Sequence, residues 1–297
     1  MKTWLRVAEK GSLFGIRLLF YACVLFGRRV ARAVLRPVIL YYVVFHADAR
    51  RFSRDYLQRV CAKATFWMIY RHMLNFAEVS LDRVFFLQGK IAGMQVGSNG
   101  FEHLRKLRSE GKGAILLGAH LGSFEAMSVL AGHKDLRINI LTYRGNSQMM
   151  NSVLGKINPS LNARFIEIAP GNVNTILRIK ELIEAGEMVA VMGDRADLDT
   201  NLVTADFLGA KAYFPASLYT LAAVLGCPIL LTVSLYTPPN RYEFYCEPFA
   251  DKLSLPRGNR AEAIAQYAQQ YAGRLEHFCK MEPGNWFNFY DFWSARS

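Results

Sequence analysis

The chain has 297 residues, 52% of them hydrophobic, so it can bury a sizeable core as one large domain or two small ones. Its formal net charge is +12, and residues 1–60 hold 12 Lys and Arg against Glu9, Asp48 and Asp55, a net of +9, which leaves only +3 for the other 237 residues. Five cysteines occur without a CxxC pair, which argues against a disulfide framework or a zinc site and favours reduced thiols.

The N-terminal arm combines this positive charge with long apolar runs. Leu13–Phe26 holds a single arginine and Pro37–Phe45 holds no charge, and neither run reaches the roughly 20 residues that a membrane-spanning helix needs. Because a nucleic-acid-binding arm would be basic and polar, nucleic acid is not an expected partner.

The arginines of the arm recur at helical spacing. On a helix, five of them fall near one face: Arg6, Arg17, Arg28, Arg32 and Arg36. A basic stripe beside a bulky apolar face is typical of a helix in a membrane interface, so residues 1–46 are predicted to form amphipathic membrane-interface helices. The alternative is a buried helix pair whose arginines face solvent.

Strand-like and helical segments alternate from about residue 113, after a mostly helical region over 1–85. The strand-like runs are Ala114–Gly118, Arg137–Tyr143, Arg164–Ile168, Met188–Met192 and Ile229–Leu235, with helical runs at 123–132, 147–155, 172–185 and 215–225. This alternation predicts an α/β fold with a mainly parallel sheet flanked by helices. Tyr242–Glu247 is expected to add an antiparallel strand at the edge, and Gly258–Lys280 a closing helix.

Two apolar segments lie in the second half of the chain. Phe207–Pro215 is expected to be a loop that leads into a helix and either lines an apolar channel or belongs to the core. The densely aromatic Trp286–Trp293 is expected to pack as a lid over the core, and the alternative is a membrane-interface belt.

The most informative motif follows the first predicted strand. Ala119-His120 comes directly after it, Gly122-Ser123 is a predicted turn, and Glu125 lies in the first helical turn beyond. A carboxylate beside an imidazole fixes the tautomer of the ring and stabilises the imidazolium that forms when it takes up a proton. His120 and Glu125 are therefore predicted to form a general-base dyad, with the nucleophile supplied by the substrate. The alternative is a helix-capping histidine beside a surface glutamate.

Two further polar clusters are predicted at the same rim, because ligands bind beyond the carboxyl ends of parallel strands. Arg144 follows the second strand, and Gly193-Asp194-Arg195 follows the fourth. Arg144 and Arg195 are expected to hold an anionic group, since guanidinium matches phosphate oxygens in bidentate fashion; the alternative is structural pairing with nearby aspartates. Asp194 is expected to orient an arginine, cap the following segment or contact substrate.

The remaining histidines lack comparable context and are interpreted as surface or capping residues: His46, His72, His103, His133 and His277. Four motifs are missing from the sequence: G-x-S-x-G, G-x-x-x-x-G-K-[ST], G-x-G-x-x-G after a strand, and H-E-x-x-H. Serine hydrolases of the usual type, P-loop NTPases, nicotinamide enzymes and zincins therefore lose support.

His120-x4-Glu125 with Gly193-Asp194-Arg195 further along, in this strand–helix context, resembles the bacterial lipid A biosynthesis acyltransferases of the lauroyl and myristoyl type. They belong to the wider glycerolipid acyltransferase superfamily. The resemblance covers nearly the whole chain, and Arg144 stands where the family carries a substrate-binding arginine. Further similar segments are Tyr41-Tyr42, Ala49–Leu57, the helix with Arg71 and Asn75, Phe214-Pro215 and Trp286–Trp293.

The resemblance implies acyl transfer from an acyl carrier protein thioester, or from acyl-CoA, to a hydroxyl of a lipid or glycolipid acceptor. His120 would take the hydroxyl proton, Glu125 would orient His120, and backbone N–H groups after His120, with Arg195, would stabilise the oxyanion. Arg144, Asp194 and Arg195 would bind substrate, and no metal or tightly bound cofactor is implied. The membrane-interface helices at 1–46 would hold an acyltransferase domain at 47–297 on the cytoplasmic face of the bacterial inner membrane, where its basic surface would dock the carrier protein.

Other functions stay open at this point. An acyl thioesterase would release free fatty acid without an acceptor. Relatives of the family act on acceptors other than lipid A, such as an aryl polyene lipid or a lipoamino acid. A non-catalytic membrane-binding protein with the same fold would tolerate His120→Ala.

Overall fold

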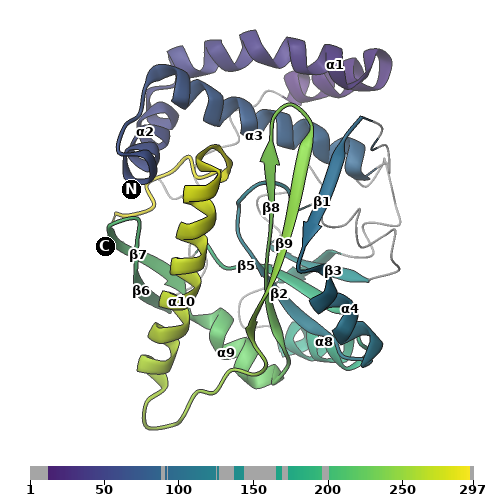
Figure 1. Ribbon diagram of the computed structural model, residues 1–297, viewed down its shortest axis with the longest axis vertical. Helices are drawn as coiled ribbons and strands as arrows, with labels where there is room; N and C mark the ends of the chain where they lie inside the picture. Colours follow the sequence, from purple (N-terminus) through teal and green to yellow (C-terminus); the bar gives the residue numbers. More distant parts are fainter. Residues whose placement is uncertain are drawn as a thin grey trace.

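The computed structural model places a seven-stranded sheet between helices, with two long helices across one end of it (Figure 1). It describes residues 13–87, 91, 93–124, 126, 137–143, 165–168, 173–195 and 201–294. The sheet order is β1-β9-β8-β2-β5-β3-β4, and five of its six pairings are parallel; only β8 and β9 pair antiparallel. The predicted α/β fold with a mainly parallel sheet is confirmed.

The central strand, β2 (Ala114–Gly118), is buried on both faces of the sheet, which explains its unbroken apolar sequence. Ile115 and Leu117 pack into the cluster that includes α8, α9 and α10, whereas Ala114 and Leu116 pack against α4 on the other face. A strand covered on both faces needs apolar side chains at every position. The strands of the sheet are β1 (Gln95–Asn99), β2 (Ala114–Gly118), β3 (Ile138–Tyr143), β4 (Phe165–Ile168), β5 (Met188–Met192), β8 (Ile229–Thr237) and β9 (Arg241–Ala250).

The predicted helical segments are helices wherever the structure describes them, and Phe101–Ser109 is a further helix that the sequence did not predict. They are α1 (Leu13–Phe45), α2 (Ala47–Cys61), α3 (Phe66–Leu87), α4 (Phe101–Ser109), α8 (Val173–Glu184), α9 (Ala216–Leu225) and α10 (Arg260–Met281), followed by the 3-10 turn η2 (Pro283–Asn285). The helix expected at 147–155 lies outside the described residues, as does most of the one expected at 123–132. Figure 1 shows α1 across one end of the sheet with α3 beneath it.

Two expectations about strands are corrected. Tyr242–Glu247 lies within β9, which is antiparallel as expected but is not an edge strand, because β1 pairs along its other side. The segment Phe207–Pro215 is not a loop: β6 (Leu202–Phe207) and β7 (Ala210–Pro215) form a hairpin. Its two-residue turn, Leu208-Gly209, has φ values of 50° and 78°, and such turns match the twist of paired strands. Phe207 and Phe214 are buried, so this segment belongs to the core.

Two arginines of the stripe that the sequence predicts, Arg28 and Arg32, do not face solvent on α1. Arg28 and Arg32 are largely buried, and each contacts the carboxylate of Asp82 on α3 at 2.6 Å. Both also donate to the Pro239 carbonyl at the tip of the β8–β9 hairpin, and Tyr242 Oη donates to Asp82 at 2.6 Å. Buried guanidinium groups need paired charge, so this side of α1 faces the protein.

The opposite side of α1 is apolar and exposed. Its exposed side chains recur at helical spacing: Val30, Val34, Val38, Tyr41 and Phe45. Of the described helices, none is by itself long and apolar enough to cross a membrane; the pair Gly27–Phe45 and Ala47–Cys61, bent by 93°, meets that test of length and composition only when taken together.

Candidate active site

The register of two neighbouring parallel strands brings His120 and Asp194 together. β2 pairs with β5 so that Gly118 lies opposite Met192, and each of the two polar residues stands two positions beyond its strand's member of that pair. The carboxyl ends of the strands therefore place both side chains at one rim, as the sequence predicts. Glu125 and Arg144, the other residues expected there, lie outside the described residues.

The carboxylate of Asp194 is held by three N–H groups. Its Oδ1 accepts from His120 Nδ1 at 2.8 Å, and its Oδ2 accepts from the backbone N–H of His120 at 2.9 Å and from Trp286 Nε1 at 3.0 Å. Burial by itself would raise the pKa of Asp194, but the interactions with His120 and the charge of Arg195 lower it to about 2. Asp194 is thus an ionised carboxylate fixed against the imidazole.

The imidazole of His120 is prepared to accept a proton. Since its Nδ1 faces an ionised carboxylate, Nδ1 carries the hydrogen and Nε2 keeps a free lone pair. Burial lowers the pKa of His120, the positive charge of Arg195 lowers it further, and Asp194 opposes both effects. The ring is therefore neutral near pH 7, and its side chain is 33% exposed, so a substrate can reach it.

The turn after His120 is fixed by backbone hydrogen bonds to two other segments. The Gly122 N–H donates to the Asn285 carbonyl at 2.9 Å, and the Ser123 N–H donates to the Ser234 carbonyl of β8 at 2.8 Å. Gly122 has a φ of 69°, and a Cβ at this position would overlap the Ser234 carbonyl, so only glycine fits. These two N–H groups are therefore occupied by carbonyl oxygens of the protein.

Two arginines act on this site from different elements. Arg195 directly follows Asp194; its Nη2 donates to the Phe287 carbonyl at 3.5 Å and its guanidinium lies 5.8 Å from the centroid of the Tyr290 ring. Arg83 of α3 also lowers the pKa of His120 by its charge. Arg195 was expected at this rim, whereas no motif in the sequence marks Arg83.

The C-terminal segment contributes more than a lid. Trp286, Phe287 and Phe292 are buried, as expected of a packed aromatic tail. Beyond packing, the Phe287 N–H donates to the His120 carbonyl at 2.9 Å, and Trp286 contacts Asp194 as described above. The aromatic spacing predicts burial, but it carries no signal that one indole nitrogen faces a carboxylate.

His72 is a residue that the sequence-based interpretation placed wrongly. It is fully buried rather than a surface or capping residue, and its Nε2–H donates to the Trp286 carbonyl at 2.8 Å while its Nδ1 accepts from Ser53 Oγ at 2.9 Å. Burial lowers its pKa to about 4, so it is neutral near pH 7. Residue spacing along one helix does not show which face of that helix is buried, so the sequence did not predict the burial of His72.

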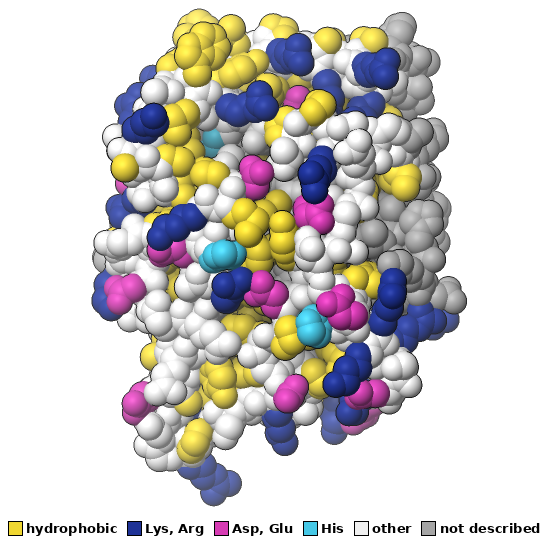
Figure 2. Space-filling view, in the orientation of Figure 1, with side chains coloured by type: hydrophobic (Ala, Val, Ile, Leu, Met, Phe, Trp, Pro, Cys, Tyr) yellow, Lys and Arg dark blue, Asp and Glu magenta, His cyan; other side chains and the backbone are white. Residues whose placement is uncertain are grey.

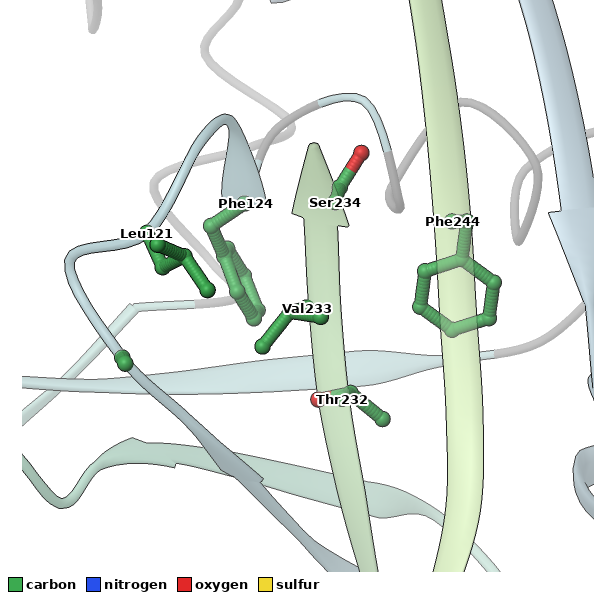
Figure 3. A pocket seen from close by; sticks show the side chains of 7 residues that line it. Leu121, Phe124, Thr232, Val233, Ser234 and Phe244 are labelled. Carbon is green, nitrogen blue, oxygen red and sulfur yellow. The ribbon is translucent and has the colours of Figure 1, made fainter. Parts of the chain in front are cut away.

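A small pocket adjoins the turn after His120 (Figure 3). Leu121 and Phe124 point into it from the turn, Thr232 and Ser234 belong to β8, and Phe244 stands on β9. Its cavity volume is about 10 Å³, far below the roughly 300 Å³ at which ligand pockets begin. The hydroxyls of Thr232 and Ser234 are buried and make no hydrogen bond within the described part of the chain.

Comparison with known proteins gives one family. The model of a family described as bacterial lipid A biosynthesis acyltransferase matches residues 62–294, which is more than half of the chain and includes His120, Asp194 and Trp286. No curated protein matches the chain significantly.

Proposed function

The chain belongs to the bacterial lipid A biosynthesis acyltransferase family, and we propose that it moves a fatty acyl chain from an acyl carrier protein thioester, or from acyl-CoA, to a hydroxyl of a lipid acceptor. The observation that carries this proposal is the His120–Asp194 pair at the end of the central strand, inside the range that the family model matches. The pair offers a base without a protein nucleophile, which is what transfer to a substrate hydroxyl requires.

In the proposed reaction, Nε2 of His120 accepts the proton of the acceptor hydroxyl as its oxygen attacks the thioester carbonyl carbon. The C–S bond then breaks, the imidazolium returns the proton to the departing thiolate, and an ester and a free thiol result. Asp194 keeps the Nδ1–H tautomer and stabilises the imidazolium. Glu125, which the sequence assigns as the partner of His120, is retained in the proposal as a second carboxylate. Replacing Asp194 and Glu125 one at a time separates the contribution of each carboxylate to His120.

Positive charge supports the binding of anionic groups at this rim. The guanidinium groups of Arg195 and Arg83 both act on His120, so a developing oxyanion or a phosphate near Nε2 would be stabilised by them. Because the N–H groups of Gly122 and Ser123 are occupied, we assign the oxyanion contact chiefly to Arg195. Arg144 remains a proposed substrate-binding residue on the basis of the sequence.

The apolar side of α1 supports association with a membrane surface. Figure 2 shows hydrophobic side chains along the upper edge of the molecule, over α1, with Lys and Arg among them. Phe66 and Trp67 at the start of α3 are exposed as well. Exposed apolar patches of this kind are typical of interfacial helices, so we propose that this side of the protein rests on the cytoplasmic face of the inner membrane, where a lipid acceptor can enter.

The experiment that tests the proposal is mass spectrometry of total lipid extracts. Cells without the protein are compared with cells complemented by the wild type, by His120→Ala, or by His277→Ala, which alters an exposed histidine on α10. The expected result is a lipid that lacks one acyl chain in the deletion and in His120→Ala, and regains it with the wild type and the control. An unchanged lipid profile in His120→Ala would reject transfer by this site.

A further inference from the structure

We infer that Trp286 is a positioning residue for the proposed general base: its indole N–H fixes the rotation of the Asp194 carboxylate, and through it the imidazole of His120. This inference rests on the proposed function only in giving His120 its role as base. The geometry behind it concerns three side chains that come from three distant parts of the sequence.

The two oxygens of Asp194 have different tasks. Oδ2 receives two N–H groups, from the His120 backbone at 2.9 Å and from Trp286 Nε1 at 3.0 Å, and Oδ1 is left for the ring of His120 at 2.8 Å. Two donors on one oxygen define both where that oxygen lies and the plane of the carboxylate. Without the indole, the His120 backbone N–H is the one remaining donor to Oδ2 among the described residues, and the carboxylate can rotate away from the line to Nδ1.

Trp286 itself is firmly held. The residue is 1% exposed, and its ring contacts those of Tyr56, Phe207 and Phe292 edge to face, with centroids 5.1, 5.1 and 4.8 Å away. Its backbone carbonyl accepts from Nε2 of the buried His72. Because both the ring and the main chain are fixed by neighbours outside the catalytic pair, Trp286 can transmit a fixed orientation to Asp194.

The indole N–H also affects charge at the site. A donor to the carboxylate favours its ionised form, so removal of the donor is expected to raise the pKa of Asp194. A carboxylate that rotates away from Nδ1 also ceases to raise the pKa of His120. The other groups whose charge acts on His120 are Arg195, which follows Asp194, and Arg83 of α3. Tyr271 of α10 interacts electrostatically with Asp194. All of these stay in place when only Trp286 is changed.

The chain offers a matched control within the same aromatic cluster. Trp293 packs against Trp286 with centroids 5.9 Å apart, but its Nε1–H donates to the Phe207 carbonyl at 3.2 Å instead of to a carboxylate. Trp286→Phe and Trp293→Phe remove the same atoms from neighbouring positions of one tail. Only the first removes a donor from Asp194.

The test is nitrogen NMR of the histidine side chains in the full-length protein across a pH titration, with no substrate needed. In the wild type and in Trp293→Phe, His120 is expected to carry its hydrogen on Nδ1 with equal pKa values. In Trp286→Phe, rotation of the carboxylate is expected to lower the pKa of His120 and the fraction of its ring with hydrogen on Nδ1, and kcat for acyl transfer is expected to fall about 10- to 100-fold with little change in KM. An unchanged pKa and tautomer of His120 in a folded Trp286→Phe protein would overturn the inference.

A second replacement covers the case in which Trp286→Phe does not fold. Benzothienylalanine at position 286 keeps the two fused rings and puts sulfur in place of the indole N–H, so packing is retained and the donor is lost. It is expected to shift the pKa of His120 as Trp286→Phe does, and an unshifted value would refute the positioning role. If the pKa of His120 shifts but the wild type has no acyl transfer activity, the proposed function fails and the positioning role stands.

Discussion

Replacing Asp194 by Asn tests the proposed tautomer directly. An amide has one oxygen and one NH2 where the carboxylate has two acceptors. The Oδ2 position faces two N–H donors, whereas the Oδ1 position faces one, so the amide oxygen is expected at Oδ2 and the NH2 opposite Nδ1 of His120. Nδ1 must then accept, and the hydrogen moves to Nε2, the atom that has to take the substrate proton.

The size of the effect follows from these contacts. Turning the amide to restore the active tautomer would place its NH2 group against two buried N–H donors. Each unsatisfied donor costs roughly 1–3 kcal/mol, which together corresponds to a loss of about 10²-fold or more in rate. Loss of the negative charge beside the imidazolium adds to this. The same substitution beside the catalytic histidine of a serine protease lowers kcat about 10⁴-fold, so we expect a loss of about 10³- to 10⁴-fold.

The assay is the initial rate of acyl transfer from an acyl thioester to the lipid acceptor that the lipid profiles identify, in mixed micelles near neutral pH. Circular dichroism and thermal unfolding show whether each variant is folded. Asp206→Asn is the control, because Asp206 is exposed and pairs only at the surface with Lys211 at 3.0 Å. A folded Asp194→Asn protein with a kcat close to the wild type would refute the proposed role of the carboxylate.

Three further outcomes are expected. Burial holds the pKa of His72 at about 4 against an ordinary 6.5, so between these values the unfolded chain binds more protons, and about 3 kcal/mol of stability should be lost as pH falls from 6.5 toward 4. Urea unfolding of His72→Gln should therefore show a flatter dependence of stability on pH than the wild type. Equal pH dependence in the two proteins would contradict this. Asp82→Asn leaves two buried arginines of α1 without their carboxylate and should lower the free energy of unfolding by about 3–5 kcal/mol in chemical denaturation; a change within error would show that these ion pairs do not hold α1. Val38→Glu on α1 should reduce flotation with anionic vesicles while activity in micelles persists. The control Val224→Glu, at a 72% exposed site on α9, should bind vesicles like the wild type. Equal vesicle binding by both variants would contradict the proposal that α1 contacts the membrane.

Much of the sheet could be predicted from local pattern alone. β2 and β5 have the expected bounds because a strand buried on both faces needs an unbroken apolar run, and such a run is visible in one sequence. β1 escaped prediction because Gln95–Asn99 is a short, polar strand at the edge, where pairing with β9 supplies the backbone hydrogen bonds without apolar side chains. The β6–β7 hairpin was missed because its turn needs a positive φ at Leu208, a residue that gives no turn signal.

For the residues of the site, too, the sequence predicts one part of the arrangement and the tertiary structure decides the other. His120 and Asp194 follow parallel strands directly, and the carboxyl ends of parallel strands share a rim, so the sequence by itself places them at one edge of the sheet. Which carboxylate contacts the imidazole depends on the order of strands: β2 and β5 are neighbours, and their register sets Asp194 opposite His120. Strand order results from long-range packing and leaves no trace in local spacing.

The contributions of α1, α3 and the tail depend wholly on tertiary structure. The arginines of α1 have the spacing of an exposed stripe, yet Arg28 and Arg32 are turned inward by Asp82, 50 or more residues away in the chain. Trp286 and His72 likewise acquire their roles from partners on other elements. Periodicity determines which residues of a helix share a face; what that face meets is decided when distant elements pack, because a buried charge or N–H group is stable only where a partner is within reach.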